Sequence, residues 1–236
     1  VVGAHGCDTP QACEAARTRL TAHLDGAFHV VNDAALLGPA AGLDSSIQLI
    51  VGTGAIVVGT DAAGGMVTVG GHGWLFGDFG SAPALLRESM RLISRYDSEG
   101  QPPDPLAEEL MKFYDVPDVS ALAYALSDAA DATAWGRHGV LFFEQLERGS
   151  QVARRVLDDA ADALVQDILA AVARGAVGDV VLAAGGVITG QPALVDSLRR
   201  RLEVRAPFLT LRVLDVPPVC GAINLALRGG GRPHAT

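Results

Sequence analysis

The stretch IQLIVGTGAIVVGTDAAGGMVTVGGHGWLFGDFGS, residues 47–81, decides the fold. Two runs of apolar, mostly β-branched residues, 47–51 and 55–60, are joined by Gly52-Thr53-Gly54. A third run, 66–69, follows a turn rich in glycine, so the stretch predicts consecutive antiparallel strands. A turn on Gly-Thr-Gly leaves backbone N–H groups unpaired at its tip, and such groups bind phosphate oxygens. We therefore expect this hairpin to bind an anion.

The rest of the chain alternates strand and helix patterns, which indicates an α/β protein. Further strands are predicted over residues 1–4, 27–31, 179–184 and 209–214. Helices are predicted from Pro10, Ser81 and Pro192, and over residues 34–41, 106–114, 119–126, 132–147, 151–172 and 220–227. Thr9 is predicted to cap the first of these helices, with Pro10 in its first turn.

Composition and charge exclude several classes of protein. The chain has 236 residues, of which 49% are hydrophobic and 19% charged, so it folds around a substantial core. Its net charge of −9 argues against a nucleic-acid or acidic-membrane partner. No apolar run reaches the length of a membrane span, and three cysteines without a zinc-type spacing predict a reduced, cytoplasmic protein without a metal site of its own.

Five motifs, in this order, resemble the actin/sugar kinase/Hsp70 superfamily. They are VVNDA at 30–34, VGTGA at 51–55, GGHGWLFGDFGS at 70–81, LAAGGVI at 182–188 and PPVCGAINLAL at 217–227. Within the superfamily, the chain resembles the BadF/BadG/BcrA/BcrD ATPase family, which includes N-acetylglucosamine kinase and bacterial glucosamine kinases. The resemblance covers nearly the whole chain. It implies an actin-like ATPase (ribonuclease H-like) fold and ATP-dependent phosphorylation of an amino sugar, with Mg²⁺, at the C6 hydroxyl.

The nucleotide contacts that the resemblance implies come from two glycine motifs. Gly52, Thr53 and Gly54 match the family's second phosphate motif, in which glycines let the backbone approach an anion. Gly185 and Gly186 match its adenosine motif. Each has a plain structural alternative, namely a hairpin turn and a turn after a buried strand. The family usually has serine where this chain has Ala55, so one phosphate contact is in question.

The sugar and proton-transfer contacts come from two further segments. Asp33 matches the catalytic base, which must accept the proton of the attacking hydroxyl, and Asn32 is placed to orient it or to touch the sugar. Gly73, Asp78 and Ser81 match the family's sugar-binding loop. The alternative for either aspartate is a helix cap. The family often has tryptophan at His72 and glutamate at Phe79, which leaves the identity of the sugar open.

The superfamily's first phosphate motif, a glycine-rich hairpin with an aspartate, is not found in this sequence. We therefore expect residues 1–31 to be a remnant of the first lobe and residues 32–217 to form the second, nucleotide- and sugar-binding lobe. Residues 218–228 are predicted to form a helix that packs on the first lobe, and 229–236 a flexible tail. A chain of this composition is expected not to phosphorylate sugar on its own, whereas the full-length protein should.

Two other functions remain open from the sequence. One is an ATPase activator of a 2-hydroxyacyl-CoA dehydratase, although such activators use paired cysteines for an iron–sulfur cluster and cysteines are sparse here. The other is a non-catalytic module that senses a sugar or a nucleotide. The sequence does not choose between N-acetylglucosamine, glucosamine and another hexose, or between a monomer and a homodimer.

Overall fold

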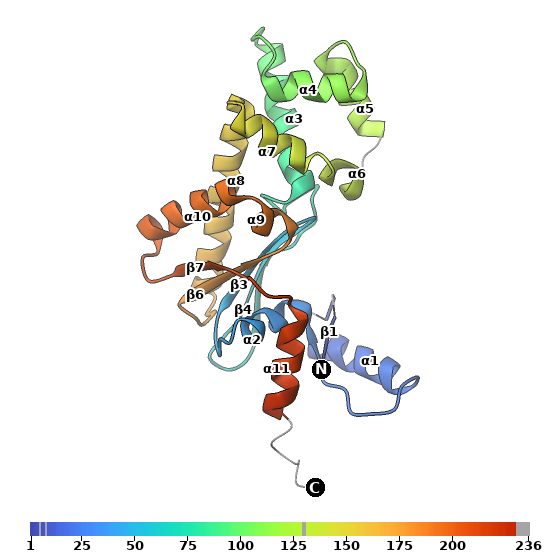
Figure 1. Cartoon of the computed structure of the whole chain (residues 1–236), viewed down its shortest axis with the longest axis vertical. Helices are drawn as coiled ribbons and strands as arrows, with labels where there is room; N and C mark the ends of the chain where they lie inside the picture. Colours follow the sequence, from blue (N-terminus) through green and yellow to red (C-terminus); the bar gives the residue numbers. More distant parts are fainter. Residues whose placement is uncertain (5, 8, 129–130, 230–236) are drawn as a thin grey trace.

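A five-stranded mixed sheet forms the centre of the molecule (Figure 1). The computed structural model describes residues 1–4, 6–7, 9–128 and 131–229. The sheet has the order β5-β4-β3-β6-β7, in which β3 pairs antiparallel with β4 and parallel with β6. Its strands are β3 (Ile47–Val51), β4 (Ala55–Thr60), β5 (Met66–Gly70), β6 (Val180–Ala184) and β7 (Thr210–Val213). The predicted bounds of β3 and β4 are confirmed.

Helices cover both faces of this sheet. The long helix α8 (Gln151–Ala173) packs on β3, β4 and β5, and α10 (Pro192–Arg205) packs beside it on β7. The short helix α2 (Leu37–Ala40) lies on the opposite face, where Leu37 packs in a small cluster with Leu182, Ala184 and Leu214. Ile47, Leu49, Val51 and Val57 are fully buried, because the sheet is covered on both sides. Within the described residues, no helix is long and apolar enough to cross a lipid bilayer.

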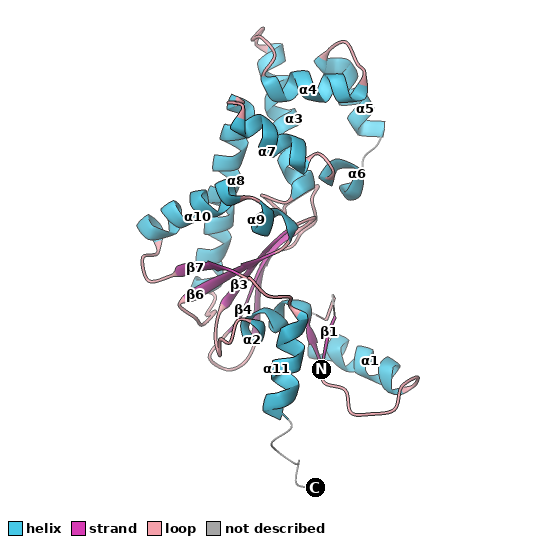
Figure 2. Cartoon of the chain, viewed as in Figure 1, coloured by secondary structure: helices cyan, strands magenta, loops and turns pink. Residues whose placement is uncertain are grey.

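The amino-terminal segment forms a separate small unit at one end of the molecule (Figure 2). It consists of β1 (Val2–Ala4), α1 (Pro10–Thr21), β2 (Val30–Asn32) and the 3₁₀ turn η1 (Asp33–Leu36). Strands β1 and β2 pair in parallel as a two-stranded sheet. The last helix, α11 (Val219–Gly229), returns to this unit and packs closely on η1 and α2. Gly221 makes this approach possible, because a Cβ there would lie 2.0 Å from the Leu36 carbonyl oxygen.

A helical subdomain lies beyond the other end of the sheet (Figure 1). It is formed by α3 (Ala82–Ser98), α4 (Pro105–Tyr114), α5 (Val119–Asp128), α6 (Ala132–Gly136) and α7 (Gly139–Glu147). Helix α3 begins where the glycine-rich segment after β5 ends, and the predicted start at Ser81 is confirmed, where the Ser81 side chain caps the helix. The capping of α1 by Thr9 is also confirmed, by a 3.1 Å bond from the Ala12 amide.

Three features differ from the sequence predictions. The predicted strand 27–31 is shorter and shifted to Val30–Asn32, because β1 offers only three residues to pair with it. The predicted helix 132–147 is broken at His138, which is buried and bonded to the Tyr114 hydroxyl (2.8 Å). A short helix, α9 (Gly186–Gly190), follows β6 directly. The predicted tail begins at Gly229, which ends α11, and its remaining residues, 230–236, lie outside the described residues.

Asp104 connects α4 of the subdomain to the start of α8. Its carboxylate caps α4 through the Leu106 amide (2.9 Å) and also accepts bonds from the Gln151 amide (2.9 Å) and the Ser150 hydroxyl (2.5 Å) at the start of α8. We expect Asp104→Ala to lower the free energy of unfolding by about 2–3 kcal/mol, since it removes the caps of two helices. Asp131→Ala, which removes the single cap of α6, should cost about 1 kcal/mol. Urea denaturation measures both, and equal losses would contradict the double role of Asp104.

Candidate active site

The tip of the β3–β4 hairpin presents free backbone donors. The Gly52 N–H donates to the Gly54 carbonyl (2.8 Å), and the Gly52 carbonyl accepts from the Ala82 amide at the start of α3 (2.9 Å). Thr53 and Gly54 are exposed, and their amides make no hydrogen bond within the described part of the chain. The tip is therefore anchored at Gly52 and open at the next two residues, as an anion site requires.

The turn after β6 lies directly against this tip. Strands β3 and β6 run in parallel with Ile50 opposite Ala184, so both chains leave the sheet at the same edge. Gly185 has a φ of +107°, and a Cβ there would lie 2.5 Å from the Val51 carbonyl oxygen. A Cβ on Gly52 would lie 3.4 Å from the Gly186 nitrogen. The structure thus brings together the two glycine motifs that the sequence proposes for the nucleotide.

A glycine-rich loop, residues 70–80 and here called the glycine loop, brings Asp78 to the same place. Asp78 is 8% exposed and has a left-handed φ of +52°. Its Oδ2 lies 3.2 Å from the position that a Cβ would take on Gly54. Its Oδ1 has no hydrogen-bond partner among the described residues. A buried carboxylate oxygen without a partner costs free energy, and a bound ligand that donates a hydrogen bond would remove that cost.

The loop is held by contacts on both sides of Asp78. Arg87 of α3 donates to the Gly77 carbonyl (3.0 Å) and lies over the ring of Phe79 (5.5 Å). Trp74 packs against Trp135 of α6 in a tilted arrangement, with ring centroids 4.8 Å apart. Ser81 is fully buried, and its hydroxyl accepts from the Ala84 amide (3.4 Å) as the cap of α3. In this conformation Ser81 positions the loop. Because Ser81 is the cap of α3, the alternative that Asp78 is present as a helix cap does not apply.

Burial raises the pKa of Asp78. The amides of Gly73 and Ala55 and the charges of His72 and Arg87 act in the opposite direction and lower this pKa, but burial has the larger effect. The folded state therefore binds the Asp78 proton more tightly than the unfolded state does. The stabilising contribution of the protonated form is complete below the unfolded pKa of about 3.9 and is lost as pH rises through the higher folded-state pKa.

We therefore expect Asp78→Asn to be more stable than the wild type at pH 7.5, by on the order of 1 kcal/mol. Asparagine keeps the left-handed backbone and carries no charge. The gain should shrink as pH falls toward 4, where the wild-type carboxylate becomes protonated. Thermal unfolding of both proteins between pH 4 and 7.5 tests this, and a variant that is less stable at pH 7.5 would contradict it.

Asn32 and Asp33 lie in the amino-terminal unit, where β2 ends and η1 begins. Both side chains contact the Ala34 amide, which lies 2.8 Å from Asn32 Oδ1 and 3.0 Å from Asp33 Oδ1. Asn32 is buried, whereas Asp33 is exposed at the start of η1. Leu37, one turn further along, packs on Ala184 next to the second glycine motif. Asp33 is thus an exposed residue at the start of η1, which leads into α2, the helix that packs on β6.

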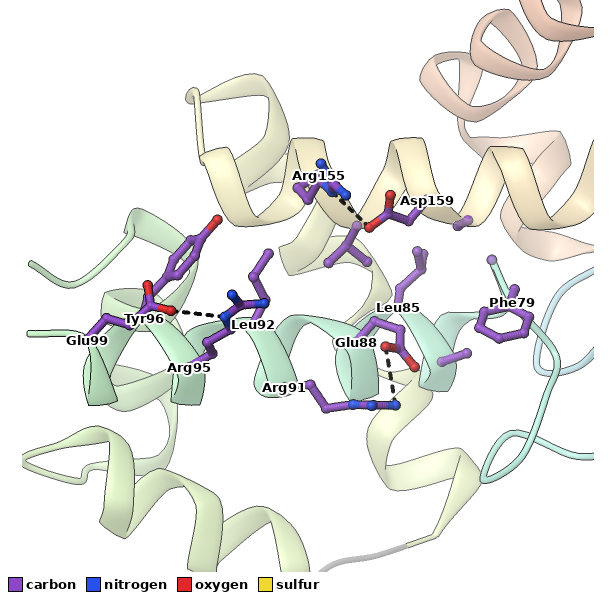
Figure 3. A pocket seen from close by; sticks show the side chains of 14 residues that line it. Phe79, Leu85, Glu88, Arg91, Leu92, Arg95, Tyr96, Glu99, Arg155 and Asp159 are labelled. Carbon is purple, nitrogen blue, oxygen red and sulfur yellow. Dashed lines mark hydrogen bonds and ion pairs between the residues drawn. The ribbon is translucent and has the colours of Figure 1, made fainter. Parts of the chain in front are cut away.

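Two grooves among the described residues contain neither of the glycine motifs. One, of about 540 Å³, runs between α3 and α8 and begins at Phe79 (Figure 3). Its charged side chains are paired, for example Arg155 with Asp159 at 2.9 Å. The other, of about 920 Å³, lies between the amino-terminal unit and the opposite end of the sheet and includes Asn32. The candidate site is therefore part of neither groove.

Sequence reasoning missed two charged residues at the glycine loop. Arg87 looks like one more polar residue of an amphipathic helix, and only the fold shows that it holds the loop. Asp167 stands next to the buried Ile168 in α8 and is itself half-buried. An acidic residue beside the apolar face of a buried helix is unusual, and the sequence shows this pattern at Asp167. The pattern does not predict which residues Asp167 contacts.

The fold is the actin-like ATPase fold of sugar kinases. One structure with this fold, from Chromobacterium violaceum and provisionally assigned as an N-acetylglucosamine kinase, has a TM-score of 0.69 and 21% identity, covering 88% of this chain and 70% of that one. A similarly assigned protein from Porphyromonas gingivalis has a TM-score of 0.68 and 20% identity, covering 96% and 76%. A Listeria monocytogenes protein provisionally assigned as an N-acetylmannosamine kinase has a TM-score of 0.53 at 16% identity, covering 91% and 70%. No protein-family model and no curated sequence matches the chain.

Proposed function

We propose that this chain provides the nucleotide- and sugar-binding lobe of an ATP-dependent amino-sugar kinase that phosphorylates N-acetylglucosamine or glucosamine at the C6 hydroxyl. The observation that carries the proposal is the meeting of three features at one sheet edge. Among the described residues, these are the Thr53 and Gly54 amides without a hydrogen bond, the bare backbone at Gly185-Gly186, and the Asp78 Oδ1 without a partner. Similarity to structures assigned as amino-sugar kinases supports it. The order of the motifs supports membership of the BadF/BadG/BcrA/BcrD family.

Different residues of the chain have different roles in the proposed phosphoryl transfer. The Thr53 and Gly54 amides and the Thr53 hydroxyl donate to phosphate oxygens, and Gly186, with open space in front of its Cα, accommodates the adenosine. Asp78 accepts hydrogen bonds from sugar hydroxyls, and Gly73 allows the loop to lie close to the ring. Asp33 takes the proton of the attacking hydroxyl, with Asn32 fixing the turn from which Asp33 projects.

The residues present fit a nucleotide that carries its own cation. No cluster of three or more His, Cys, Asp or Glu among the described residues could hold a metal ion. Mg²⁺ is commonly held by substrate phosphates with only one or two carboxylates, so we assign it to the nucleotide rather than to a protein site. When bound, the Mg²⁺–nucleotide supplies the phosphoryl group and neutralises the charge that develops on it.

The lobe assignments are part of the proposal. Residues 1–31 and 218–228 are assigned to the first lobe or to its contact surface, and 32–217 to the second. Three apolar side chains of α11, Val219, Ile223 and Leu227, are exposed at four-residue intervals, which supports a further packing surface on this helix. We place the protein in the cytoplasm, with neither a nucleic acid nor a membrane as partner, and leave the choice between monomer and homodimer to sedimentation.

The test is a coupled assay of ADP release on the protein expressed from its complete coding sequence, with a panel of hexoses and amino sugars. We expect ATP-dependent phosphorylation of N-acetylglucosamine or glucosamine, with the position fixed by NMR of the product. The 236-residue chain alone should show no turnover, because it carries only one glycine-rich phosphate hairpin. ATP hydrolysis that no sugar stimulates would reject the kinase, and turnover by the chain alone would reject the lobe assignment.

A further inference from the structure

The two ends of the glycine loop lie against the long helix α8. A Cβ on Gly70 would come within 3.4 Å of Asp167 Oδ2. A Cβ on Gly80 would come within 2.8 Å of Leu164 Cδ1, one turn earlier on the same helix. The ends of the loop are therefore placed by the main body of the protein. Its middle, which precedes Asp78, contacts a different part of the fold.

Trp74, in the middle of the glycine loop, packs against the helical subdomain. Its ring centroid lies 4.8 Å from that of Trp135 in α6, and the two ring planes make an angle of 53°. Tilted aromatic pairs attract each other at centroid separations of about 4.5–7 Å, so this contact is favourable. Trp74 is half-buried, whereas the next two residues of the loop, Leu75 and Phe76, are exposed. Of these three large apolar side chains, Trp74 is thus the one that the fold covers.

Trp135 is itself fixed within the subdomain. Its Nε1–H donates to the Leu126 carbonyl of α5 (3.1 Å), and its side chain packs on the main hydrophobic core. The Asp131 carboxylate caps α6 by accepting from the amides of Thr133 and Ala134, both at 2.8 Å. The helix and the ring are held independently of the glycine loop, so Trp135 offers Trp74 a fixed surface.

Helix α6 also contacts the chain that follows the glycine loop. It packs closely on α3, which begins directly after Ser81 (Figure 1). A Cβ on Gly136, at the end of α6, would lie 3.7 Å from the Ala82 Cβ and 3.6 Å from the Pro83 Cδ. Because these two residues form the first turn of α3, α6 contacts the loop in its middle and the helix that ends it.

Two successive turns connect Trp74 to the start of α3, and Asp78 lies between them. The first turn is closed by the Gly77 amide, which donates to the Gly73 carbonyl (2.8 Å). The second is closed by the Ser81 amide, which donates to the Asp78 carbonyl (2.9 Å). Since α6 contacts the chain on both sides of these turns, it restricts where the Asp78 carboxylate can lie.

We infer that Trp74 and Trp135 are positioning residues, through which the helical subdomain holds Asp78 against the tip of the β3–β4 hairpin. The inference rests on the proposed function, because the ligand that benefits is the sugar that we assign to Asp78. The nucleotide motifs lie on the hairpin and on the turn after β6, so the tryptophan contact acts on the affinity for the sugar and not on that for the nucleotide. The inference gives the subdomain a role in sugar binding.

The contact can be measured without any activity, because the 236-residue chain has two tryptophans and both are in it. Two indoles in contact at a skewed angle couple their electronic transitions. The circular dichroism of the chain should therefore contain a split tryptophan signal, which Trp74→Phe and Trp135→Phe should each remove. A wild-type tryptophan signal equal to the sum of those of the two variants would show that the rings are apart, and would overturn the inference.

Amide hydrogen exchange in the same chain measures the effect on the loop. The Gly77 and Ser81 amides, which close the two turns, should exchange about tenfold faster in Trp74→Ala and in Trp135→Ala. Trp135→Phe keeps a ring for Trp74 to pack on, so it should have a smaller effect. Trp74 is a half-buried loop residue, so Trp74→Ala carries the test even if Trp135→Ala does not fold. Tyr124→Ala, at an exposed aromatic residue of α5, is the matched control and should leave exchange unchanged.

Steady-state kinetics of the full-length enzyme tests the link to the sugar. Trp74→Ala and Trp135→Ala should each raise the sugar KM about tenfold, with kcat and the ATP KM within twofold of wild type. Because both variants break one contact, the double variant should raise the sugar KM no more than either single variant. Unchanged exchange in Trp74→Ala would overturn the inference, and so would faster exchange with an unchanged sugar KM in an active kinase. Faster exchange in a full-length protein that phosphorylates no sugar would instead reject the proposed function and leave the contact between loop and subdomain unaffected.

Discussion

Replacement of Asp33 by asparagine is expected to lower kcat of the full-length protein by about 10²- to 10⁴-fold, the usual contribution of a general base. Asparagine has nearly the same shape and still accepts a hydrogen bond from the Ala34 amide, so the start of η1 should remain intact. What it cannot do is take the proton of the sugar hydroxyl. The melting temperature and the affinity for a non-hydrolysable ATP analogue should stay at wild-type values, because the nucleotide motifs lie on β3 and β6.

The control for this variant is Asp25→Asn, an exposed aspartate in the loop between α1 and β2. Asp25→Asn should leave kcat unchanged. That result would show that the fall in kcat of Asp33→Asn does not come from the loss of one negative charge in the amino-terminal unit. Steady-state kinetics with saturating sugar separates kcat from KM. A kcat within threefold of wild type in Asp33→Asn would show that Asp33 is not the general base. Asp78 would then be the one acidic residue that we assign to the sugar.

The sequence predicts the parts of this site that depend on local chemistry. The bounds of β3 and β4 are confirmed because apolar runs and the Gly-Thr-Gly turn determine a hairpin without help from distant residues. The predicted start of the helix at Ser81 is confirmed for the same reason, since Ser81 caps α3 and a cap and its helix are neighbours in the chain. The sequence could not show that the buried Asp78 carboxylate keeps an oxygen without a hydrogen-bond partner in the described part of the chain.

What the sequence misses depends on contacts between distant segments. The break between α6 and α7 occurs where Gly139 passes Ala82 at the start of α3, with 3.2 Å from a Cβ of Gly139 to the Ala82 Cβ. The bonds of Asp104 to Ser150 and Gln151 span more than forty residues, as their numbers show. Asp167 meets Gly70 only after α8 has folded across β5. In each case the residue types are common ones, and the fold determines which residues come into contact. A local sequence pattern does not predict such contacts.

Substitution by alanine should affect protein stability differently at the two glycines after β6. Gly185→Ala is expected to lower the free energy of unfolding by about 3 kcal/mol, because its Cβ would lie 2.5 Å from the Val51 carbonyl oxygen and its φ of +107° is strained for any other residue. The atoms that it meets are backbone atoms of β3 and cannot move aside without breaking the sheet edge. Gly186→Ala, by contrast, meets nothing within 4 Å and has no positive φ, so it should change stability by no more than about 0.5 kcal/mol.

The open space at Gly186 is the reason to expect a functional effect there. If the adenosine lies against this backbone, the Gly186→Ala methyl group occupies part of its position, and the dissociation constant of an ATP analogue should rise about tenfold or more. Calorimetry on the folded full-length variant measures this directly, and urea denaturation of the 236-residue chain measures the stability of both variants. Wild-type nucleotide affinity in Gly186→Ala would move the adenosine away from this turn. A stable Gly185→Ala protein would show that the chain after β6 lies further from Val51 at the end of β3 than the structure places it. In that case the two glycine motifs would not form one phosphate- and adenosine-binding edge.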